Sequence, residues 1–210
     1  MAEPAGARAT AAALAFAVLA SCGVEASRSL DTPTLQDKIM AGPPTTTECP
    51  RGFDLVPVLG GAGLPGIALR SADVEVVDAR GEASDAARRT QTSFVWCPFS
   101  DSENDLDVDV VVAYSPLQVP LGLLVRRVAR TVGASSAEGL AFLERVAVTA
   151  PERAVTLIRP EGAAANVGLS VEEGAYAAVL VMTNRPHERL AADAALAVAD
   201  HLVAVEPAAA

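Results

Sequence analysis

Lysine is almost missing from this chain of 210 residues. Lys38 is the only lysine among 16 basic residues, whereas acidic residues number 26, and the formal net charge is -10. A protein that binds nucleic acid needs a basic surface that releases counterions from the phosphate backbone. The sequence therefore predicts no nucleic-acid partner.

Aromatic residues and long apolar runs are scarce as well. Aromatic residues make up 4% of the chain, and much of the 51% hydrophobic fraction is alanine, which buries little area. The core must therefore come from valine, leucine and isoleucine, and the length allows one domain of ordinary size. The apolar run at residues 11–20 is about half as long as the ~20 residues that a membrane-spanning helix needs. We predict no permanent transmembrane helix.

The first 22 residues have the layout of an export signal. Arg8 is followed by the apolar run and then by Leu-Ala-Ser directly before Cys22. These last four residues resemble a bacterial lipobox. The resemblance implies that diacylglycerol is attached to the Cys22 thiol, that the chain is cleaved before Cys22, and that the new amino terminus is acylated. Two or three acyl chains anchor a protein stably, whereas one binds only marginally. A cleaved signal without lipid is the alternative.

Once Cys22 carries lipid, two cysteines remain, Cys49 and Cys97. Exported proteins meet an oxidising environment, so we predict a disulfide between them. It would close a loop of 48 residues (97 minus 49) and stabilise the fold by about 4 kcal/mol. Two free buried thiols are the alternative. A zinc site is a weaker interpretation, because the two histidines, His187 and His201, lie far along the chain and no CxxC or HxxxH spacing occurs.

The composition divides the chain into four parts. We predict a lipoprotein signal peptide at residues 1–21, a lipid-anchored flexible tether at 22–48, a single folded domain at 49–205 and a disordered tail at 206–210. The tether is rich in Ser, Thr, Pro and Gly and has no apolar period, which is typical of a flexible linker. It would hold the domain clear of the lipid head groups.

Strands and helices in the domain come in runs rather than in strict alternation. This order predicts an α+β fold, a mostly antiparallel sheet with helices packed on one face. Residues 176–182 are apolar on both faces, as expected of a central strand. The expected strands are residues 74–79, 93–97, 106–114, 154–158, 166–171 and 175–183, and the expected helices run from Pro120 to Gly133, from Ser135 to Val148 and from Asn184 to Val205.

Two of these helices carry further signals. Ser135 and Glu138 have the spacing of a capping box, which predicts a helix start at this point. In the preceding helix, an apolar stripe is expected to face the core, whereas Arg126, Arg127 and Arg130 are expected to point mostly outward.

Two motifs suggest binding chemistry, and each fits a simpler interpretation better. Residues 61–66 match GxGxxG, but a strand expected soon after leaves no room for a phosphate-binding helix, so we predict a glycine-rich surface loop. Residues 101–109 alternate acidic side chains in the manner of a calcium loop. Counted from Asp105, however, the sixth position is Val110 and the twelfth is Pro116. We predict the solvated face of a strand, with weak calcium binding as the alternative.

No nucleophile, base or cofactor site stands out. The segment at residues 168–172 is one glycine short of the GxSxG elbow, and both histidines are expected at the surface. The aromatic residues Phe94, Trp96 and Phe99 flank Cys97 and are expected to be core packed against the disulfide. We therefore predict no catalytic, cofactor-binding or metal-binding residue and no cofactor.

Four segments together suggest a class of protein: Cys22, Glu48-Cys49-Pro50, Trp96-Cys97-Pro98-Phe99 and the closing strand and helix start at 179–184. With them the chain resembles the uncharacterised cell-envelope lipoproteins of actinobacteria. The resemblance implies a protein anchored to the cell membrane by lipid, on the extracytoplasmic face. That group shares no activity that could be carried over.

Two function classes remain. We expect a non-enzymatic binding module for an envelope partner protein or an apolar ligand such as a lipid, which predicts a pocket without convergent titratable groups. The alternative is a hydrolase of cell-envelope material. It predicts a cleft in which acidic residues of the 101–109 run meet a histidine or each other with shifted pKa values.

Overall fold

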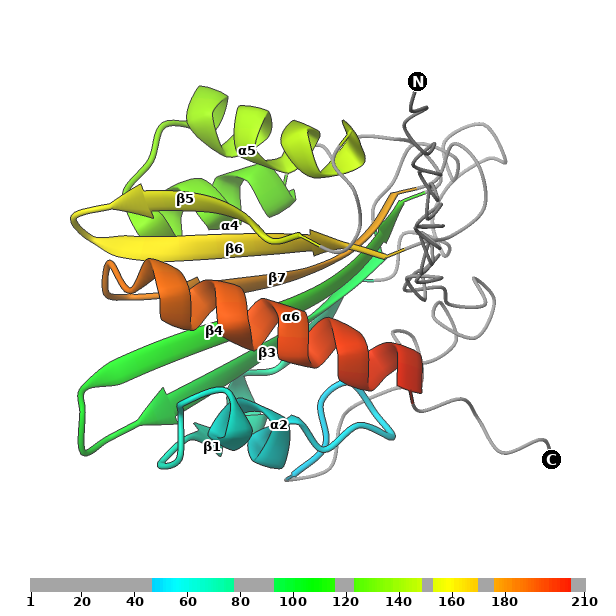
Figure 1. The fold of residues 1–210 in the computed structure, drawn as a ribbon, viewed down its shortest axis with the longest axis vertical. Coiled ribbons are helices and arrows are strands. Elements are labelled where there is room, and N and C mark those ends of the chain that lie inside the picture. Colours follow the sequence, from blue (N-terminus) through cyan, green and yellow to red (C-terminus); the bar gives the residue numbers. More distant parts are fainter. Residues whose placement is uncertain (1–46, 78–92, 116–122, 149–152, 170–175, 205–210) are drawn as a thin grey trace, which may run out of the picture.

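The computed structural model describes residues 47–77, 93–115, 123–148, 153–169 and 176–204 (Figure 1). The predicted signal peptide, Cys22, most of the tether and the tail at 206–210 therefore lie outside the described residues. Within them, no helix is both long and apolar enough to cross a membrane.

The centre of the molecule is one seven-stranded antiparallel sheet. Its strand order is β1-β3-β4-β7-β6-β5, and β2 also pairs with β3. The predicted α+β class with a mostly antiparallel sheet is thus confirmed. The strands are β1 Ala68–Leu69, β2 Glu75–Val77, β3 Ser93–Asp101, β4 Leu106–Ser115, β5 Val155–Arg159, β6 Gly162–Gly168 and β7 Tyr176–Thr183.

The central position of β7 follows from its sequence. It pairs with β4 on one side and β6 on the other, and its residues are buried on both faces, as the unbroken apolar run predicted. By contrast, β6 begins four residues before its predicted start, at Gly162 instead of Asn166. Its Gly-Ala-Ala-Ala sequence has no β-branched residue, so local preference did not reveal this strand. Pairing with both neighbours holds it in the sheet.

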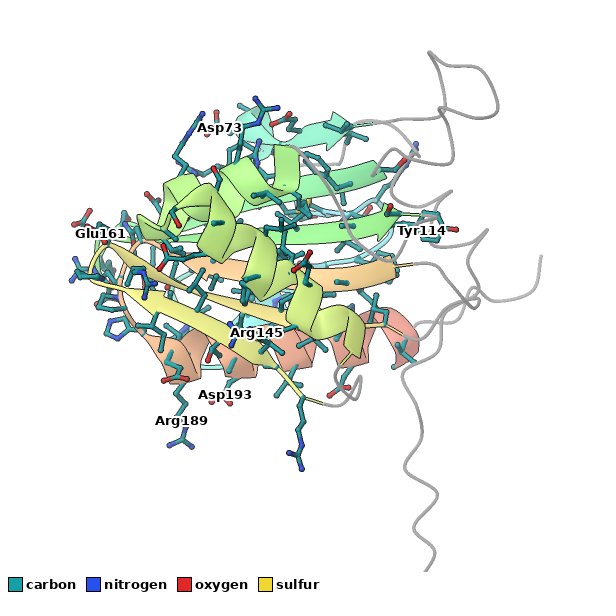
Figure 2. The ribbon with its side chains drawn as sticks, turned by 90° about the horizontal axis from the view of Figure 1, so that it is seen from above. Asp73, Tyr114, Arg145, Glu161, Arg189 and Asp193 are labelled. Atoms are coloured by element: carbon teal, nitrogen blue, oxygen red, sulfur yellow. A yellow bond between two sulfur atoms is a disulfide. The ribbon has the colours of Figure 1, made fainter. Side chains whose placement is uncertain are left out.

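Helices cover both faces of this sheet, which corrects the expectation of one covered face (Figure 2). One core cluster includes Val110, Val112 and Val198, and the other includes Val111 and Val128. Side chains alternate along a strand, and both sets of this sheet are apolar, so both need a cover. The covering helices are α2 Leu55–Gly61 and α6 Glu188–Ala204 on the first face, and α4 Leu123–Val132 and α5 Ser136–Val148 on the second.

The helix ends follow the local sequence. Ser135 and Glu138 form the predicted capping box, in which the Glu138 carboxylate accepts the Ser135 backbone N–H at 2.8 Å and the Ser135 hydroxyl accepts the Glu138 backbone N–H at 3.2 Å. Gly133 follows α4 with a φ of 70°, which a glycine adopts without strain. The predicted start of α5 and end of α4 are therefore confirmed.

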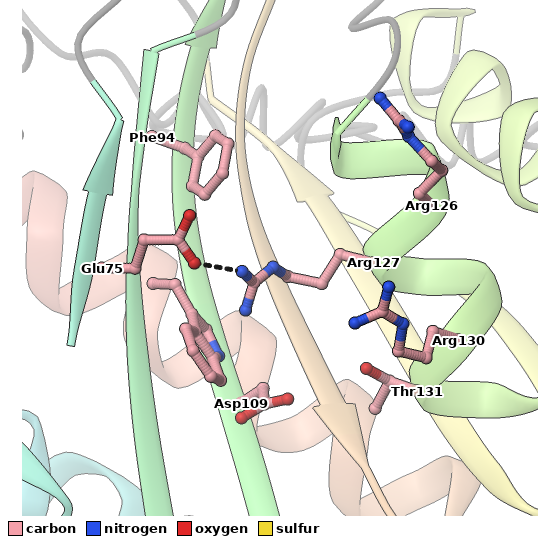
Figure 3. A pocket seen from close by; sticks show the side chains of 8 residues that line it. Glu75, Phe94, Asp109, Arg126, Arg127, Arg130 and Thr131 are labelled. Carbon is pink, nitrogen blue, oxygen red and sulfur yellow. Dashed lines mark hydrogen bonds and ion pairs between the residues drawn. The ribbon is translucent and has the colours of Figure 1, made fainter. Parts of the chain in front are cut away.

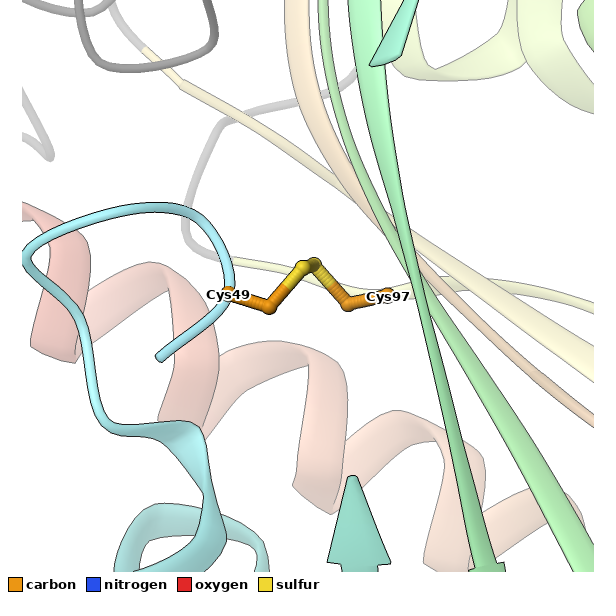
Figure 4. Close-up of a disulfide and its surroundings, with 2 residues drawn as sticks. All are labelled: Cys49 and Cys97. Atoms are coloured by element: carbon orange, nitrogen blue, oxygen red, sulfur yellow. A yellow bond between two sulfur atoms is a disulfide. The ribbon is translucent and has the colours of Figure 1, made fainter. Parts of the chain in front are cut away.

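The predicted disulfide between Cys49 and Cys97 is present (Figure 4). The two Cα atoms are 5.7 Å apart, and both cysteines are 0% exposed. The bond joins the segment before α2 to the middle of β3, on the face that α6 covers. We call this face the disulfide face and the face under α4 and α5 the cleft face.

Candidate functional site

The candidate site is a cleft on the cleft face, between α4 and the strands β2, β3 and β4 (Figure 3). Its volume of about 420 Å³ lies within the range of small-molecule sites, ~300–1,000 Å³. We call it the α4 cleft. Its lining residues are Glu75, Phe94, Trp96, Asp109, Arg126, Arg127, Arg130 and Thr131.

Strand alternation brings the two aromatic side chains into this cleft. Cys97 faces the disulfide, so Trp96 and Phe94, at odd spacings from it, point to the opposite face. Phe94 is 1% exposed, whereas Trp96 is only half-buried. The pair therefore forms an apolar wall that stays partly open to solvent.

Arg127 of α4 lies over this wall. Its guanidinium carbon is 3.9 Å from the centroid of the Trp96 ring and 5.9 Å from that of Phe94, both within cation–π range. The same guanidinium donates a hydrogen bond to the Glu75 carboxylate of β2, as the dashed line in Figure 3 marks. Arg127 thus ties α4 to β2 across the cleft, and Glu75 neutralises its charge.

Asp109 of β4 supplies a carboxylate at one end of the cleft (Figure 3). Burial raises the pKa of Asp109, while Trp96, Arg127 and Arg70 act in the opposite direction. Its Oδ1 atom is buried and has no hydrogen-bond partner among the described residues. The indole Nε1 of Trp96 is also buried and makes no hydrogen bond of good geometry among the described residues, although it lies near enough to Asp109 to lower the pKa of that carboxyl.

Arg126 and Arg130 complete the cleft from the side of α4. They are four residues apart on the helix, so both lie on one side of it. In Figure 3 the side chain of Arg130 extends toward the cleft, and that of Arg126 lies toward the end away from Asp109. Both residues are exposed, and among the described residues neither forms an ion pair. They give a protein of net charge -10 a local cationic surface.

The structure separates the members of the predicted acidic run. Asp101 is 3% exposed, accepts hydrogen bonds from its own turn and has a lowered pKa, chiefly because the Asn104 amide donates to it at 2.7 Å. Asp105 pairs with Arg185 at 3.2 Å, and Asp107 is exposed on β4. Only Asp109 enters the cleft, which corrects its expected place on a solvated face.

The other sequence motifs lie away from the cleft. Gly61 ends α2 and no helix follows residues 61–66 up to β1, so the GxGxxG match forms a loop without a phosphate-binding helix start. His187 is exposed just before α6, as expected. His201 is half-buried and meets the Phe53 ring edge-on, with centroids 6.0 Å apart. No group of three or more His, Cys, Asp or Glu side chains suited to a metal occurs in the described ranges.

Two expectations about the lining residues were wrong. Phe99 packs in the disulfide-face core as predicted, but Phe94 and Trp96 lie on the other face. Of the three arginines expected to face outward, Arg127 turns inward and is half-buried. The sequence did contain a signal for the position of Trp96. Trp96 and Cys97 are adjacent on one strand, and adjacent residues of a strand point to opposite faces of the sheet.

Comparison with known proteins gives no relative: no family model, no curated protein and no solved structure matches the chain.

Proposed function

We propose that the chain is an exported lipoprotein, anchored to the membrane through Cys22, whose domain is a non-enzymatic binding module with the α4 cleft as its binding site. The observation that carries the binding role is a pair of buried polar atoms in the cleft, Trp96 Nε1 and Asp109 Oδ1, that find no hydrogen-bond partner within the described part of the chain. Leaving a buried polar group without a hydrogen bond costs about 1–3 kcal/mol, and a bound ligand would remove this cost.

The cleft favours polar ligands over the apolar ligand expected from sequence. An apolar ligand would leave both buried polar atoms unpaired and would bury charged groups, which is unfavourable. Five of the eight described lining residues are ionisable, namely Glu75, Asp109, Arg126, Arg127 and Arg130, so the expectation of a pocket without convergent titratable groups was wrong. The binding role of the proposal therefore stands on polar recognition.

The hydrolase alternative rests on one observation, the raised pKa of Asp109, which a general acid requires. Two features speak against it. Among the described residues, no histidine, serine or cysteine lines the cleft, and the second carboxylate, Glu75, is held by Arg127. The Glu75 carboxylate is therefore already engaged by a protein side chain.

The export and anchor parts of the proposal rest on the sequence before the described residues. The lipobox-like Leu-Ala-Ser before Cys22 supports lipidation. The disulfide supports an oxidising compartment, because cytosolic thiols are kept reduced.

Intact mass of the full-length protein from membranes tests the anchor. We expect a mass that corresponds to cleavage before Cys22 and two or three acyl chains. Cys22→Ser should move the protein to the soluble fraction, whereas the matched control Ser21→Ala keeps a small residue before the cysteine and should stay membrane-bound. An unmodified amino terminus beyond Cys22 in the wild type would refute the anchor.

Extraction of small molecules that co-purify with the same protein tests the binding role. Trp96 is the only tryptophan, so its emission reports directly on the cleft when an extracted molecule is added back. We expect a saturable change in emission with no chemical change of the molecule. Turnover of envelope material that Asp109→Asn abolishes would replace the binding role with the hydrolase.

A further inference from the structure

The ligand chemistry can be taken further from the positions of the charged and polar atoms. This step rests on the proposed binding role of the α4 cleft. Trp96 Nε1 can only donate a hydrogen bond, and an ionised Asp109 can only accept one. A group that satisfies both atoms must therefore accept and donate at the same time. A hydroxyl group does this, whereas an ammonium group has no acceptor and a phosphate or carboxylate ion is repelled by Asp109.

The α4 side of the cleft requires the opposite chemistry. Arg126 and Arg130 are exposed, lie on one side of α4, and form no ion pair within the described part of the chain. Arg127 between them is already neutralised by Glu75. Two uncompensated guanidinium groups at a cleft bind carboxylate or phosphate groups through charge-assisted hydrogen bonds.

The groups that impose these two requirements lie in different parts of one cleft. Asp109 is at one end of the cleft and Arg126 lies toward the other, with Arg130 between them on the α4 side (Figure 3). A ligand that meets both carries a hydroxyl at one end and a negative charge at the other. The volume of about 420 Å³ accommodates a small molecule or the end of a chain.

We infer that the α4 cleft binds a polyol with an anionic group, either a sugar acid or a polyol phosphate. A ligand hydroxyl donates to Asp109 Oδ1 and accepts from Trp96 Nε1, while the anionic group is held by Arg126 and Arg130. Sugar acids and polyol phosphates share this chemistry, because each is a hydroxylated carbon chain with one terminal anionic group. Full affinity needs both ends, so a neutral sugar or a simple anion binds more weakly than the charged polyol.

Matched probes separate the two ends of the ligand. The emission of Trp96 is followed in the full-length protein in detergent while glucuronate, glucose, glycerol 3-phosphate, glycerol or inorganic phosphate is added. We expect at least one charged polyol to bind about tenfold or more tightly than its neutral counterpart, and more tightly than phosphate, since a charge-assisted hydrogen bond contributes about this factor. The affinities for glucuronate and for glycerol 3-phosphate then show whether the preferred ligand is a sugar acid or a polyol phosphate.

Variants locate the binding in the cleft. Arg130→Gln should weaken binding of the preferred charged polyol about tenfold and leave the neutral polyol unchanged. Asp109→Asn should weaken both, because it removes an acceptor oxygen. Arg189→Gln is the matched control, since Arg189 is 96% exposed on α6 of the disulfide face and should change neither. Circular dichroism confirms that each variant is folded before its titration is interpreted.

The outcomes distinguish this inference from the binding role itself. Equal affinity for charged and neutral polyols, phosphate binding as tight as that of the charged polyols, or equal losses in Arg130→Gln and Arg189→Gln would overturn the ligand class. If none of the probes binds but a co-purified molecule of other chemistry changes the Trp96 emission, the binding role stands and the polyol anion is wrong. If no molecule changes that emission, both are wrong.

Discussion

The two faces of the sheet are built by the same strands and yet are covered differently. On the disulfide face, α6 packs across β5, β6 and β7, and α2 beside it reaches the region of β1 and Cys97. On the cleft face, α4 and α5 lie over β5, β6 and β7, and the strands β2, β3 and β4 line the cleft. The difference lies in how far the helices extend over the sheet.

The covered and the open parts of the sheet place different limits on polar side chains. Asp109 and Val110 are neighbours on β4, but Val110 is 0% exposed in the disulfide-face core and Asp109 lies in the cleft. A carboxylate on the covered face would lose all its water without a partner, at a high cost in free energy. Asp109 accordingly lies in the part of the cleft face that α4 leaves open, whereas the buried carboxylate of Asp101 at the end of β3 is held by hydrogen bonds from its own turn.

The largest effect that tests this comparison is loss of the disulfide. Replacing Cys49 and Cys97 together by serine should lower the free energy of unfolding by about 4 kcal/mol, because the unfolded chain is freed from a loop of 48 residues. Urea denaturation followed by circular dichroism measures it. A midpoint that is the same in the double variant and the wild type would mean that the disulfide face does not depend on this bond.

Two aromatic truncations compare the faces directly. Phe99→Ala removes a ring that is 0% exposed on the disulfide face and should cost about 3–5 kcal/mol. Trp96→Ala removes a half-buried ring of the cleft and should cost about 2 kcal/mol less, while abolishing the cation–π contact of Arg127. Circular dichroism in urea is used for both, since Trp96 is the only tryptophan. Equal costs would contradict the view that the cleft face is the less tightly packed one.

The capping box of α5 provides a smaller test on the cleft face. Glu138→Ala removes the carboxylate that accepts the Ser135 N–H and bonds to Arg159, and should lower stability by about 1 kcal/mol. Ser136→Ala, at an exposed neighbouring position, is the control and should have little effect. Thermal melting measures both. The ligand affinity should stay unchanged in Glu138→Ala, because Glu138 does not line the cleft.

The smallest effect concerns pH. Burial raises the pKa of Asp109 in the folded protein above its ordinary value of 3.8, so the folded state holds this proton more tightly than the unfolded state. The contribution of Asp109 to stability is therefore complete below pH 3.8 and is lost as pH rises through the folded pKa. Asp109→Asn removes this loss. Its melting temperature relative to wild type should rise across this pH interval, and a difference that does not vary with pH would contradict the raised pKa.

Sequence reasoning worked where a local pattern determines the structure. The apolar run of β7, the Ser135–Glu138 capping box and the only two cysteines left after Cys22 each have one simple structural outcome. The start of β6 failed because its alanines have no strand preference of their own, and pairing with β5 and β7 determines it.

The candidate site was largely missed for a different reason. Its residues come from β2, β3, β4 and α4, and only the packing of α4 against the sheet brings them together. The alternation of side chains along a strand could have placed Trp96 on the face opposite to that of Cys97. No spacing in the sequence relates Arg127 to Glu75, however, because they are separated by 52 residues. The acidic pattern of β4 was visible, yet the sequence did not distinguish the cleft residue Asp109 from the exposed Asp107.

The disulfide also determines how the domain would bear mechanical load. Tension applied from the N-terminal side of Cys49 enters β3 directly through the bond to Cys97, and it bypasses the chain between them, including α2, β1 and β2. Trp96 is adjacent to that point, and β3 is held along its whole length by β4. A pull from the amino-terminal side would therefore load β3 and its pairing with β4 before it loads the first helix.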